Sequence, residues 1–293
     1  MTILSRIIFF LLFQLISLSV FTQSDASKES EKGQPFVLGV IHEIESIRLG
    51  EKRTLNIYLP EGYDPKDTVR YPVIYLLDGA ADEDFIHVVG LVQFNTFSWI
   101  ERIPKSIVVG IANTDRRRDF TYPTMIKSDK EAYPTTGGSA AFIDFLEKEL
   151  QPYIASTYKT SASRMLIGQS LGGLLATEIL LKRPALFDKY IIISPSLWWD
   201  NGSLLNLPSS ILEEIFDKAT SVYIGVGKEG LTPGEHPRVM EVDANLLADK
   251  LKASKSKNLK VYFDYLPDED HATIGHQAVF NGFRMLYPVK DNN

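Results

Sequence analysis

The feature that most constrains this chain is the stretch Arg164–Glu178, in which an apolar run, a serine between glycines and a second apolar run follow one another. At its centre, Gly168-Gln-Ser-Leu-Gly172 matches the G-x-S-x-G pattern of a sharp turn between a strand and a helix. A Cβ atom at either glycine would collide with the neighbouring strand and helix. The stretch therefore predicts a buried strand, a strained turn with Ser170 at its tip, and a helix that starts at Leu171.

Nearly continuous apolar runs recur along the chain and alternate with segments of helical spacing. Such runs are typical of parallel strands that helices cover on both faces. The predicted strands are Val73–Leu77, Ser106–Ile111, Arg164–Ile167, Tyr190–Ile193, Ser221–Val226 and Leu259–Leu266. The predicted helices are Asp84–Ile100, Gly138–Tyr158, Leu171–Lys182, Ser209–Ala219, Val239–Ala253 and His276–Leu286.

The first part of the folded region follows a different pattern. Phe36–Leu49 and Arg53–Pro60 alternate apolar and polar residues, as a half-exposed antiparallel hairpin does, with Gly50 near the turn. Together the patterns predict an α/β fold, with a mostly parallel, doubly wound sheet and an antiparallel N-terminal edge hairpin. We find no internal repeat and no linker, so we expect one domain over residues 36–293.

Composition excludes several classes of protein. The 293 residues are 44% hydrophobic and 23% charged, which is ordinary for a folded chain. The absence of cysteine excludes disulfides, thiolate metal sites and cysteine nucleophiles. A formal net charge of −6 argues against a nucleic-acid partner. No His/Asp cluster has ligand spacing such as H-E-x-x-H, so we expect no metal site.

The N-terminal segment has the pattern of an export signal. Met1–Gln23 carries one cation and then an apolar run of about 15 residues, short of the roughly 20 that span a bilayer. The polar segment Ser24–Pro35 has nothing to bury and is predicted to be a tether. We expect a signal peptide and a periplasmic or secreted mature protein without a membrane span. An uncleaved membrane anchor is the alternative.

The predicted turn gives Ser170 the position of a nucleophile. Its hydroxyl would point outward above the sheet edge, and the backbone N–H of Leu171 would be free to bind an oxyanion. The alternative is a tight strand–helix turn without a chemical role. Because serine is a weak nucleophile, a histidine must act as its base.

The base is predicted to be His271. Enzymes with this elbow carry the serine, an acid and a histidine in that order along the chain, with the histidine after the last strand. His271 stands in the loop that leaves Leu259–Leu266. The other four histidines, His42, His87, His236 and His276, are expected to be solvated or hydrogen-bonded. The alternatives are a lid or wall residue for His87 and a residue at the mouth of the site for His236.

The acid is predicted to be Glu229, because it follows the preceding strand, Ser221–Val226, at its carboxyl end. Asp200, one strand earlier, is the alternative. Asp268 and Asp270 are too close to His271 in sequence and more simply shape its loop. A second oxyanion donor is expected after Val73–Leu77, where Ala80 N–H is the first choice and Gly79 N–H the second.

Several of these segments also resemble a known family. The chain is similar to the putative esterase family, which includes esterase D, enterochelin-type siderophore esterases and relatives among feruloyl and acetyl xylan esterases. The resemblance extends from about Phe36 to Tyr287. The segments that carry it are Tyr71–Gly79, Ile103–Asp119, Gly168–Gly173, Ser194–Trp199 and Asp270-His271.

The resemblance implies an α/β-hydrolase fold and hydrolysis of a small-molecule or carbohydrate ester without a cofactor. It also implies Ser170 as nucleophile, Glu229 as acid and His271 as base. One departure concerns Arg118–Pro123, which has one residue more than the Arg-Asp-Leu-Thr-Pro of relatives. A same-fold acyltransferase and a non-catalytic binding protein are the alternatives.

Two groups at the same sheet edge are candidates for substrate binding. Arg116 and Arg118 follow a predicted strand and suit an anionic or catecholate substrate. Pairing with neighbouring aspartates is the alternative. Trp198 and Trp199 follow the predicted strand Tyr190–Ile193 and suit an aromatic wall, with packing of one of them against the next helix as the alternative.

Overall fold

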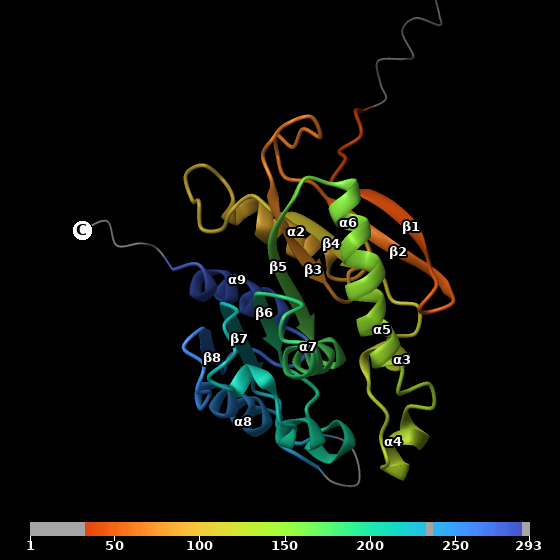
Figure 1. Cartoon of the computed structure of the whole chain (residues 1–293), viewed down its shortest axis with the longest axis vertical. Coiled ribbons are helices and arrows are strands. Elements are labelled where there is room, and N and C mark those ends of the chain that lie inside the picture. Colours follow the sequence, from red (N-terminus) through yellow and green to blue (C-terminus); the bar gives the residue numbers. More distant parts are fainter. Residues whose placement is uncertain (1–32, 233–236, 289–293) are drawn as a thin grey trace, which may run out of the picture. The chain divides into compact units, whose positions relative to one another are not determined.

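A computed structural model describes residues 33–232 and 237–288. From Gly39 onward the described residues form one compact unit around an eight-stranded sheet of order β1-β2-β4-β3-β5-β6-β7-β8 (Figure 1). The strands are β1 (Val40–Ser46), β2 (Glu51–Tyr58), β3 (Tyr71–Leu76), β4 (Ile107–Ile111), β5 (Thr160–Gln169), β6 (Lys189–Ile193), β7 (Thr220–Gly227) and β8 (Leu259–Leu266).

Strand direction follows the sequence pattern. The strands β3 to β8 pair in parallel, whereas β1 pairs with β2 and β2 with β4 in antiparallel register. The antiparallel hairpin therefore lies at the N-terminal edge of the sheet, as predicted. Every residue of β4 is buried, which explains its continuous apolar run.

Helices cover both faces of the sheet. The helices α2 and α9 pack together, with α9 on β6 and β7, whereas α7 packs on β5 and β6 and α8 on β7 and β8. The helical segments are α2 (Phe85–Asn95), α3 (Arg116–Phe120), α4 (Lys127–Ala132), α5 (Ser139–Phe145), the π-helical η2 (Leu146–Leu150), α6 (Gln151–Thr157), α7 (Leu171–Lys182), the 3-10 segments η3 (Trp199–Asn206) and η4 (Ser210–Leu212), α8 (Met240–Lys252) and α9 (Ile274–Leu286).

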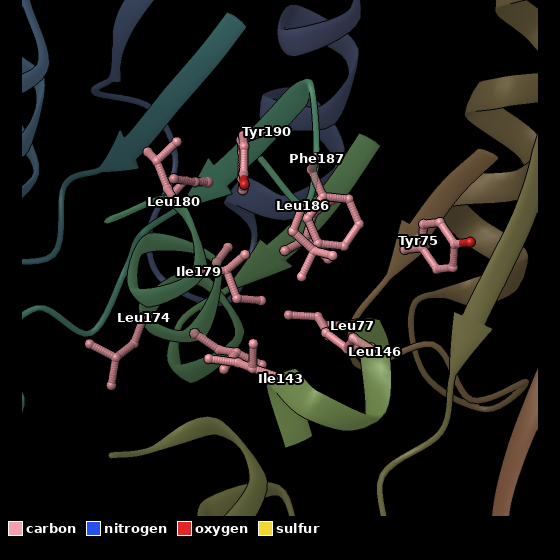
Figure 2. Packing of buried hydrophobic residues seen from close by; sticks show 14 of the residues in the cluster. Tyr75, Leu77, Ile143, Leu146, Leu174, Ile179, Leu180, Leu186, Phe187 and Tyr190 are labelled. Atoms are coloured by element: carbon pink, nitrogen blue, oxygen red, sulfur yellow. The ribbon is translucent and has the colours of Figure 1, made fainter. Parts of the chain in front are cut away.

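The core on the α7 side shows why these strands are held in place. Figure 2 shows Leu77 beside Leu146 of η2, in a group with Ile179 of α7 and with Phe187 of the segment before β6. The ring of Tyr75 in β3 lies 5.7 Å from that of Phe187, centroid to centroid. All five side chains are at most 2% exposed. Full burial of each one contributes about 1.5–3 kcal/mol to folding. This packing fixes β3 and β5, whose carboxyl ends carry the loops that form the site.

One predicted helix is wrong. Ser209–Ala219 forms only the single turn η4, and Ile215 is 87% exposed. The physical reason is that the loop between α8 and β8 takes the backbone acceptors that a helix would use. Lys255 N–H donates to Leu212 O at 3.0 Å, and Ser256 Oγ donates to Phe216 O at 2.8 Å.

The other predicted elements are present with small shifts of their ends. The segment Gly138–Tyr158 is helical but divides into α5, η2 and α6, and the three arginines from Arg116 form the short α3 instead of a loop. The predicted signal peptide, Met1–Gln23, lies outside the described residues. Within the ranges 33–232 and 237–288, no helix has the length and apolar character needed to cross a membrane.

Candidate active site

Ser170 lies at a strained turn between β5 and α7. Its backbone adopts φ 60° and ψ −120°, a conformation that costs a non-glycine residue about 1–3 kcal/mol. The turn is held by a hydrogen bond from Ser170 N–H to Ile193 O at 3.0 Å. A Cβ at Gly168 would lie 2.5 Å from Gly172 O, so only glycine permits this close approach. The elbow thus has the form that the sequence predicts.

A chain of two hydrogen bonds joins the three residues selected from the sequence. His271, in the loop after β8, places Nε2 3.0 Å from Ser170 Oγ and Nδ1 2.7 Å from Glu229 Oε2. Glu229 follows β7 and its side chain is 3% exposed, whereas the His271 side chain is 45% exposed. The imidazole therefore connects a buried carboxylate to a hydroxyl at the open edge of the sheet.

Neighbouring groups hold the Glu229 carboxylate and its loop. Ser194 Oγ donates to Glu229 Oε1, so both carboxylate oxygens have a donor. The backbone N–H of Glu229 donates to Glu241 Oε1 at 2.8 Å, as does that of Gly230 at 3.1 Å. The pKa of the Glu241 carboxyl is lowered overall. Burial alone would raise this pKa, but the hydrogen bonds from the backbone N–H groups of Glu229, Gly230 and Glu241 itself outweigh burial. Asp200, the alternative acid, instead accepts a hydrogen bond from Thr124 Oγ1 at 2.7 Å.

The loop that carries His271 is fixed at both ends. Lys228 N–H donates to Glu269 O at 2.7 Å, which ties the loop after β8 to the loop after β7. The Asp270 carboxylate accepts hydrogen bonds from Ala272 N–H at 2.8 Å and from Thr273 N–H at 3.0 Å. These backbone donors lower the pKa of Asp270. Asp270 thus shapes the loop of His271, in agreement with the sequence interpretation.

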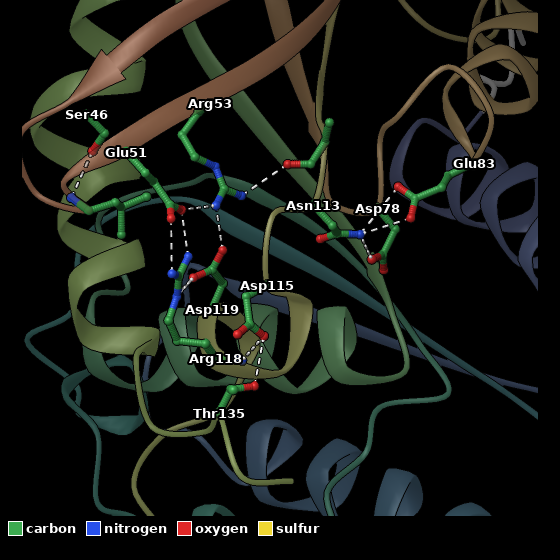
Figure 3. A network of polar contacts seen from close by, with 12 residues as sticks. Ser46, Glu51, Arg53, Asp78, Glu83, Asn113, Asp115, Arg118, Asp119 and Thr135 are labelled. Atoms are coloured by element: carbon green, nitrogen blue, oxygen red, sulfur yellow. Dashed lines mark hydrogen bonds and ion pairs between the residues drawn. The ribbon is translucent and has the colours of Figure 1, made fainter.

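The predicted oxyanion donors differ in what they contact. Leu171 N–H lies in the first turn of α7, where backbone N–H groups lack intrahelical partners. Gly79 N–H donates to Ile111 O at 3.0 Å and is therefore engaged within the fold. Ala80 N–H donates to Glu83 Oε2 at 3.3 Å. Glu83 also accepts from Asn113 Nδ2 at 3.1 Å (Figure 3). A carboxylate thus occupies the donor that the sequence favours.

The two predicted arginines lie in ion pairs. Arg116 makes a bidentate pair with Asp78, at 2.6 and 2.9 Å, and its Nη2 is 3.2 Å from Gln169 O beside the elbow. Arg118 pairs with Glu51 and Asp119 (Figure 3). Arg116 therefore remains next to Ser170, while Arg118 belongs to a cluster that holds β2 against α3.

The two tryptophans have different environments. Trp199 is fully buried, and its Nε1 donates to Tyr122 O at 2.9 Å. A side chain in that position cannot form a wall for substrate, so the structure places Trp199 in the core. Trp198 is half-buried and lies 6.0 Å from the Tyr133 ring, centroid to centroid. Burial in the core thus accounts for Trp199, and Trp198 stays the candidate wall residue.

Three of the remaining histidines lie within the described residues. His87 of α2 is hydrogen-bonded to His276 of α9, and the two rings stack with centroids 4.7 Å apart. His42 Nδ1 is 2.8 Å from Tyr153 Oη. His236 lies outside the described residues. In the part of the chain that the structure describes, no three or more His, Asp or Glu side chains are arranged to hold a metal ion.

Sequence reasoning missed three polar residues around Ser170, His271 and Glu229. Ser194 contacts Glu229, and Ser196 Oγ lies 3.3 Å from Ser170 Oγ. Gln169 Nε2 donates to His271 O at 2.7 Å. The Ser194–Trp199 segment carries part of the family resemblance, but nothing in its sequence shows that Ser194 contacts Glu229 or that Ser196 lies beside Ser170. Gln169 occupies the variable position of the G-x-S-x-G pattern, so the pattern gives no signal for this contact.

Fold and site together define a class of protein. A mostly parallel sheet, a serine elbow after β5, an acid loop after β7 and a histidine loop after β8 are the arrangement of an α/β-hydrolase. The profile of the family described as putative esterase matches residues 46–276. The chain therefore belongs to the putative esterase family and is a carboxylic ester hydrolase of the α/β-hydrolase fold.

Individual relatives support this assignment. Ferri-bacillibactin esterase BesA of Bacillus subtilis is 28% identical over 263 residues, which cover 81% of this chain and 86% of that protein. A crystal structure described as an IroE-like serine hydrolase from Shewanella oneidensis is 35% identical, with a TM-score of 0.75. The match covers 85% of this chain and 80% of that one. The BES protein of Bacillus cereus is 29% identical, with a TM-score of 0.71, over 88% of this chain and 98% of its own.

Proposed function

We propose that the protein is a serine esterase that cleaves its substrate through an acyl-serine intermediate, with Ser170 as nucleophile, His271 as base and Glu229 as acid. The observation that carries the proposal is the hydrogen-bond chain from the buried Glu229 through His271 to Ser170 Oγ. The strained backbone of Ser170 adds support, because it presents the hydroxyl above the sheet edge.

In the first half of the reaction Ser170 Oγ attacks the ester carbonyl carbon while its proton moves to His271 Nε2. The carbonyl oxygen becomes an oxyanion, for which Leu171 N–H and Ala80 N–H are the donors. Ala80 N–H donates to Glu83 in the free protein, so Glu83 gives up this donor when substrate binds. The bond to the alcohol oxygen then breaks, and His271 returns its proton to the departing alcohol.

In the second half a water molecule attacks the acyl-serine carbonyl and transfers a proton to His271 Nε2. The second tetrahedral intermediate collapses, the carboxylic acid leaves, and Ser170 regains its proton. Glu229 keeps the Nδ1–H tautomer of His271 and stabilises the imidazolium that forms in both halves. Its burial suits this role, since an acid at 3% exposure meets little screening by water.

The test of this mechanism is hydrolysis of a p-nitrophenyl ester by the wild-type chain and by Ser170→Ala. We expect activity to fall by at least about 10⁴-fold, because the nucleophile is lost while neighbouring packing is kept. The thermal unfolding midpoint of the variant serves as the control for folding. Substantial hydrolysis by a folded Ser170→Ala protein would move the nucleophile elsewhere.

For the substrate, we propose a siderophore ester. The support is similarity to a Bacillus subtilis protein named as a ferri-bacillibactin esterase, which this chain matches along most of both lengths. Arg116 adds support, because a guanidinium 3.2 Å from Gln169 O stands beside Ser170, where it suits an anionic or catecholate group. Trp198 stands two residues after Ser196 and remains a candidate wall residue.

A substrate panel separates this proposal from its alternatives. A cyclic catecholate siderophore with and without iron, a feruloyl sugar and an acetyl sugar would be compared by kcat/KM, with Ser170→Ala as the blank. We expect the siderophore to be preferred by at least about tenfold. A preference for the sugars would shift the assignment to acylated carbohydrates, and transfer of the acyl group to an added alcohol in place of water would indicate an acyltransferase.

We further propose export, with Met1–Gln23 as the signal. The support is the sequence pattern of a single cation followed by a short apolar run. Mass spectrometry of the protein after expression in a host with a secretion pathway tests it. Loss of this segment and recovery outside the cytoplasm are expected, whereas an intact N-terminus in the membrane fraction would support the anchor.

A further inference from the structure

We propose that Gln169 is a positioning residue, whose amide holds the His271 loop in register with the serine elbow. The inference rests on the proposed function and adds a residue that the G-x-S-x-G pattern leaves unspecified. Gln169, the residue immediately before Ser170, would thereby determine the position of His271.

Gln169 connects the elbow to the His271 loop independently of the hydrogen bond between Ser170 Oγ and the His271 ring. Its Nε2 donates to the backbone oxygen of His271 at 2.7 Å. Its own backbone oxygen accepts from Arg116 Nη2 at 3.2 Å, and Arg116 is fixed by its bidentate pair with Asp78. Gln169 is therefore anchored at its main chain and directs its side chain to the main chain of His271.

This connection matters because the His271 ring is 45% exposed. Among the described residues, two hydrogen bonds join His271 to the elbow: one from Gln169 to its backbone, and one between its ring and Ser170 Oγ. The ring bond must break and form again during each turnover as the proton moves. The Gln169 bond involves no transferred proton, so it keeps His271 in place while the ring bond changes.

Gly275 supplies an independent observation. It is the second residue of α9, has no positive φ, and a Cβ there would lie 2.8 Å from Gln169 Oε1. Glycine within a helix costs up to about 1 kcal/mol relative to alanine, so its presence needs a reason. The space of that Cβ is taken by the Gln169 amide. At Gly90 of α2, by contrast, a Cβ would meet nothing within 4 Å.

The first experiment compares Gln169→Met and Gln169→Glu with the wild-type chain. Both retain the length of the side chain and remove the N–H donor, and the glutamate adds repulsion against His271 O. We expect kcat to fall by about 10- to 100-fold with KM nearly unchanged, since small displacements of a catalytic group cost that much. Gln277→Met, which removes a side-chain bond to Asn281 on α9, is the matched control and should keep wild-type kcat.

The second experiment is a double-mutant cycle with Gly275→Ala. In the wild-type chain the new methyl group displaces the Gln169 amide, so kcat should fall about tenfold. In the Gln169→Ala chain the methyl group has room, and Gly275→Ala should leave that chain's kcat unchanged and raise its unfolding midpoint. Gly90→Ala should raise the midpoint in both chains without changing kcat.

The outcomes separate this inference from the proposed function. If the wild-type chain hydrolyses esters and both Gln169 variants keep its kcat, the positioning role is wrong and the esterase stands. An equal effect of Gly275→Ala with and without Gln169 would also overturn the positioning role. If the wild-type chain hydrolyses nothing, the proposed function fails, and the cycle in unfolding midpoints still decides whether Gln169 and Gly275 are coupled.

Discussion

Two polar clusters in this molecule are each built around buried charged side chains and behave differently. The first, the Arg53 cluster, consists of Glu51, Arg53, Arg118 and Asp119 (Figure 3). Its ion pairs measure 2.6–2.8 Å, and the side chains of Arg53 and Asp119 are fully buried. The second is the chain from Glu229 through His271 to Ser170, which starts from a buried acid and ends at the sheet edge.

The two clusters differ in whether their charges are balanced. In the Arg53 cluster two arginines face two carboxylates, so the charges balance and no group is left to react. The chain that ends at Ser170 has one acid, one imidazole and one hydroxyl, and it can pass a proton because no cation neutralises the acid permanently. Charge density alone therefore does not mark a site. In this molecule the reactive group lies in the cluster whose acid has no permanent cation partner and whose hydroxyl lies at the sheet edge.

Among substitutions of charged residues, the largest effect should come from Glu229→Gln, which removes the negative charge and keeps the volume. We expect kcat to fall by about 10³- to 10⁴-fold, because the amide no longer fixes the tautomer of His271 or stabilises its cation. Asp200→Asn is the control and should keep wild-type kcat, since Asp200 contacts Thr124 instead. The reverse result, an active Glu229→Gln and an inactive Asp200→Asn, would move the acid to Asp200.

The Arg53 cluster should respond in stability and not in chemistry. Asp119→Asn leaves the fully buried Arg53 with one carboxylate partner in place of two, and we expect unfolding free energy to fall by about 3–5 kcal/mol. Asp144→Asn removes the more exposed pair with Lys148 and should cost less than about 1 kcal/mol. Urea unfolding measures both. If Asp119→Asn kept wild-type stability and had a much lower kcat, the Arg53 cluster would serve catalysis and not stability.

Acid should weaken the Arg53 cluster through Glu51. The hydrogen bond from Arg118 holds the pKa of Glu51 below its ordinary value of 4.5, although burial opposes this. Because the folded pKa is the lower one, Glu51 stabilises the fold fully above about pH 4.5 and loses that contribution as pH falls through the lowered pKa. Glu51→Gln should therefore reduce stability at pH 7 and flatten its decline between pH 5 and 3.

The control for that titration is Glu45→Gln, which alters a surface pair with Lys52 at 3.8 Å. Its stability curve in the same acid range should follow the wild-type curve. An unchanged slope for Glu51→Gln would show that the Arg53 cluster does not sense acid through this carboxylate.

The smallest effect concerns Glu83, which contacts the proposed oxyanion donor Ala80. Glu83→Gln weakens an acceptor that competes with the substrate oxyanion, and we expect kcat/KM to rise by about two- to fivefold, the equivalent of one modest hydrogen bond. Asp82→Asn, a change at an exposed neighbouring carboxylate, should have no effect. A fall in kcat/KM for Glu83→Gln would mean that the carboxylate helps to order Asn113 in the active state.

The sequence was sufficient for the parts of the molecule that depend on local pattern and chain order. Continuous apolar runs mark β3 to β7 because both faces of these strands are covered. The elbow and the order of strands place Ser170, Glu229 and His271 at one sheet edge, since the carboxyl ends of parallel strands meet there. The hydrogen-bond distances between the three side chains come from the structure and not from topology, and their roles in catalysis stay a prediction.

The parts that depend on contacts between distant segments were not predictable. Ser209–Ala219 has helical spacing, but the distant Lys255 and Ser256 use its carbonyl groups. Trp199 follows a strand end as a wall residue would, yet the chain turns it into the core against Tyr122. The contact between Gln169 and His271 joins residues 102 positions apart, and no local pattern reports it.

The most direct test of the account is intact-mass spectrometry of the purified chain after treatment with a fluorophosphonate. We expect a single covalent adduct on Ser170, absent in Ser170→Ala and formed much more slowly in His271→Ala, because only an activated serine reacts with this reagent. The absence of an adduct on a folded wild-type protein, or an adduct that persists in Ser170→Ala, would contradict it.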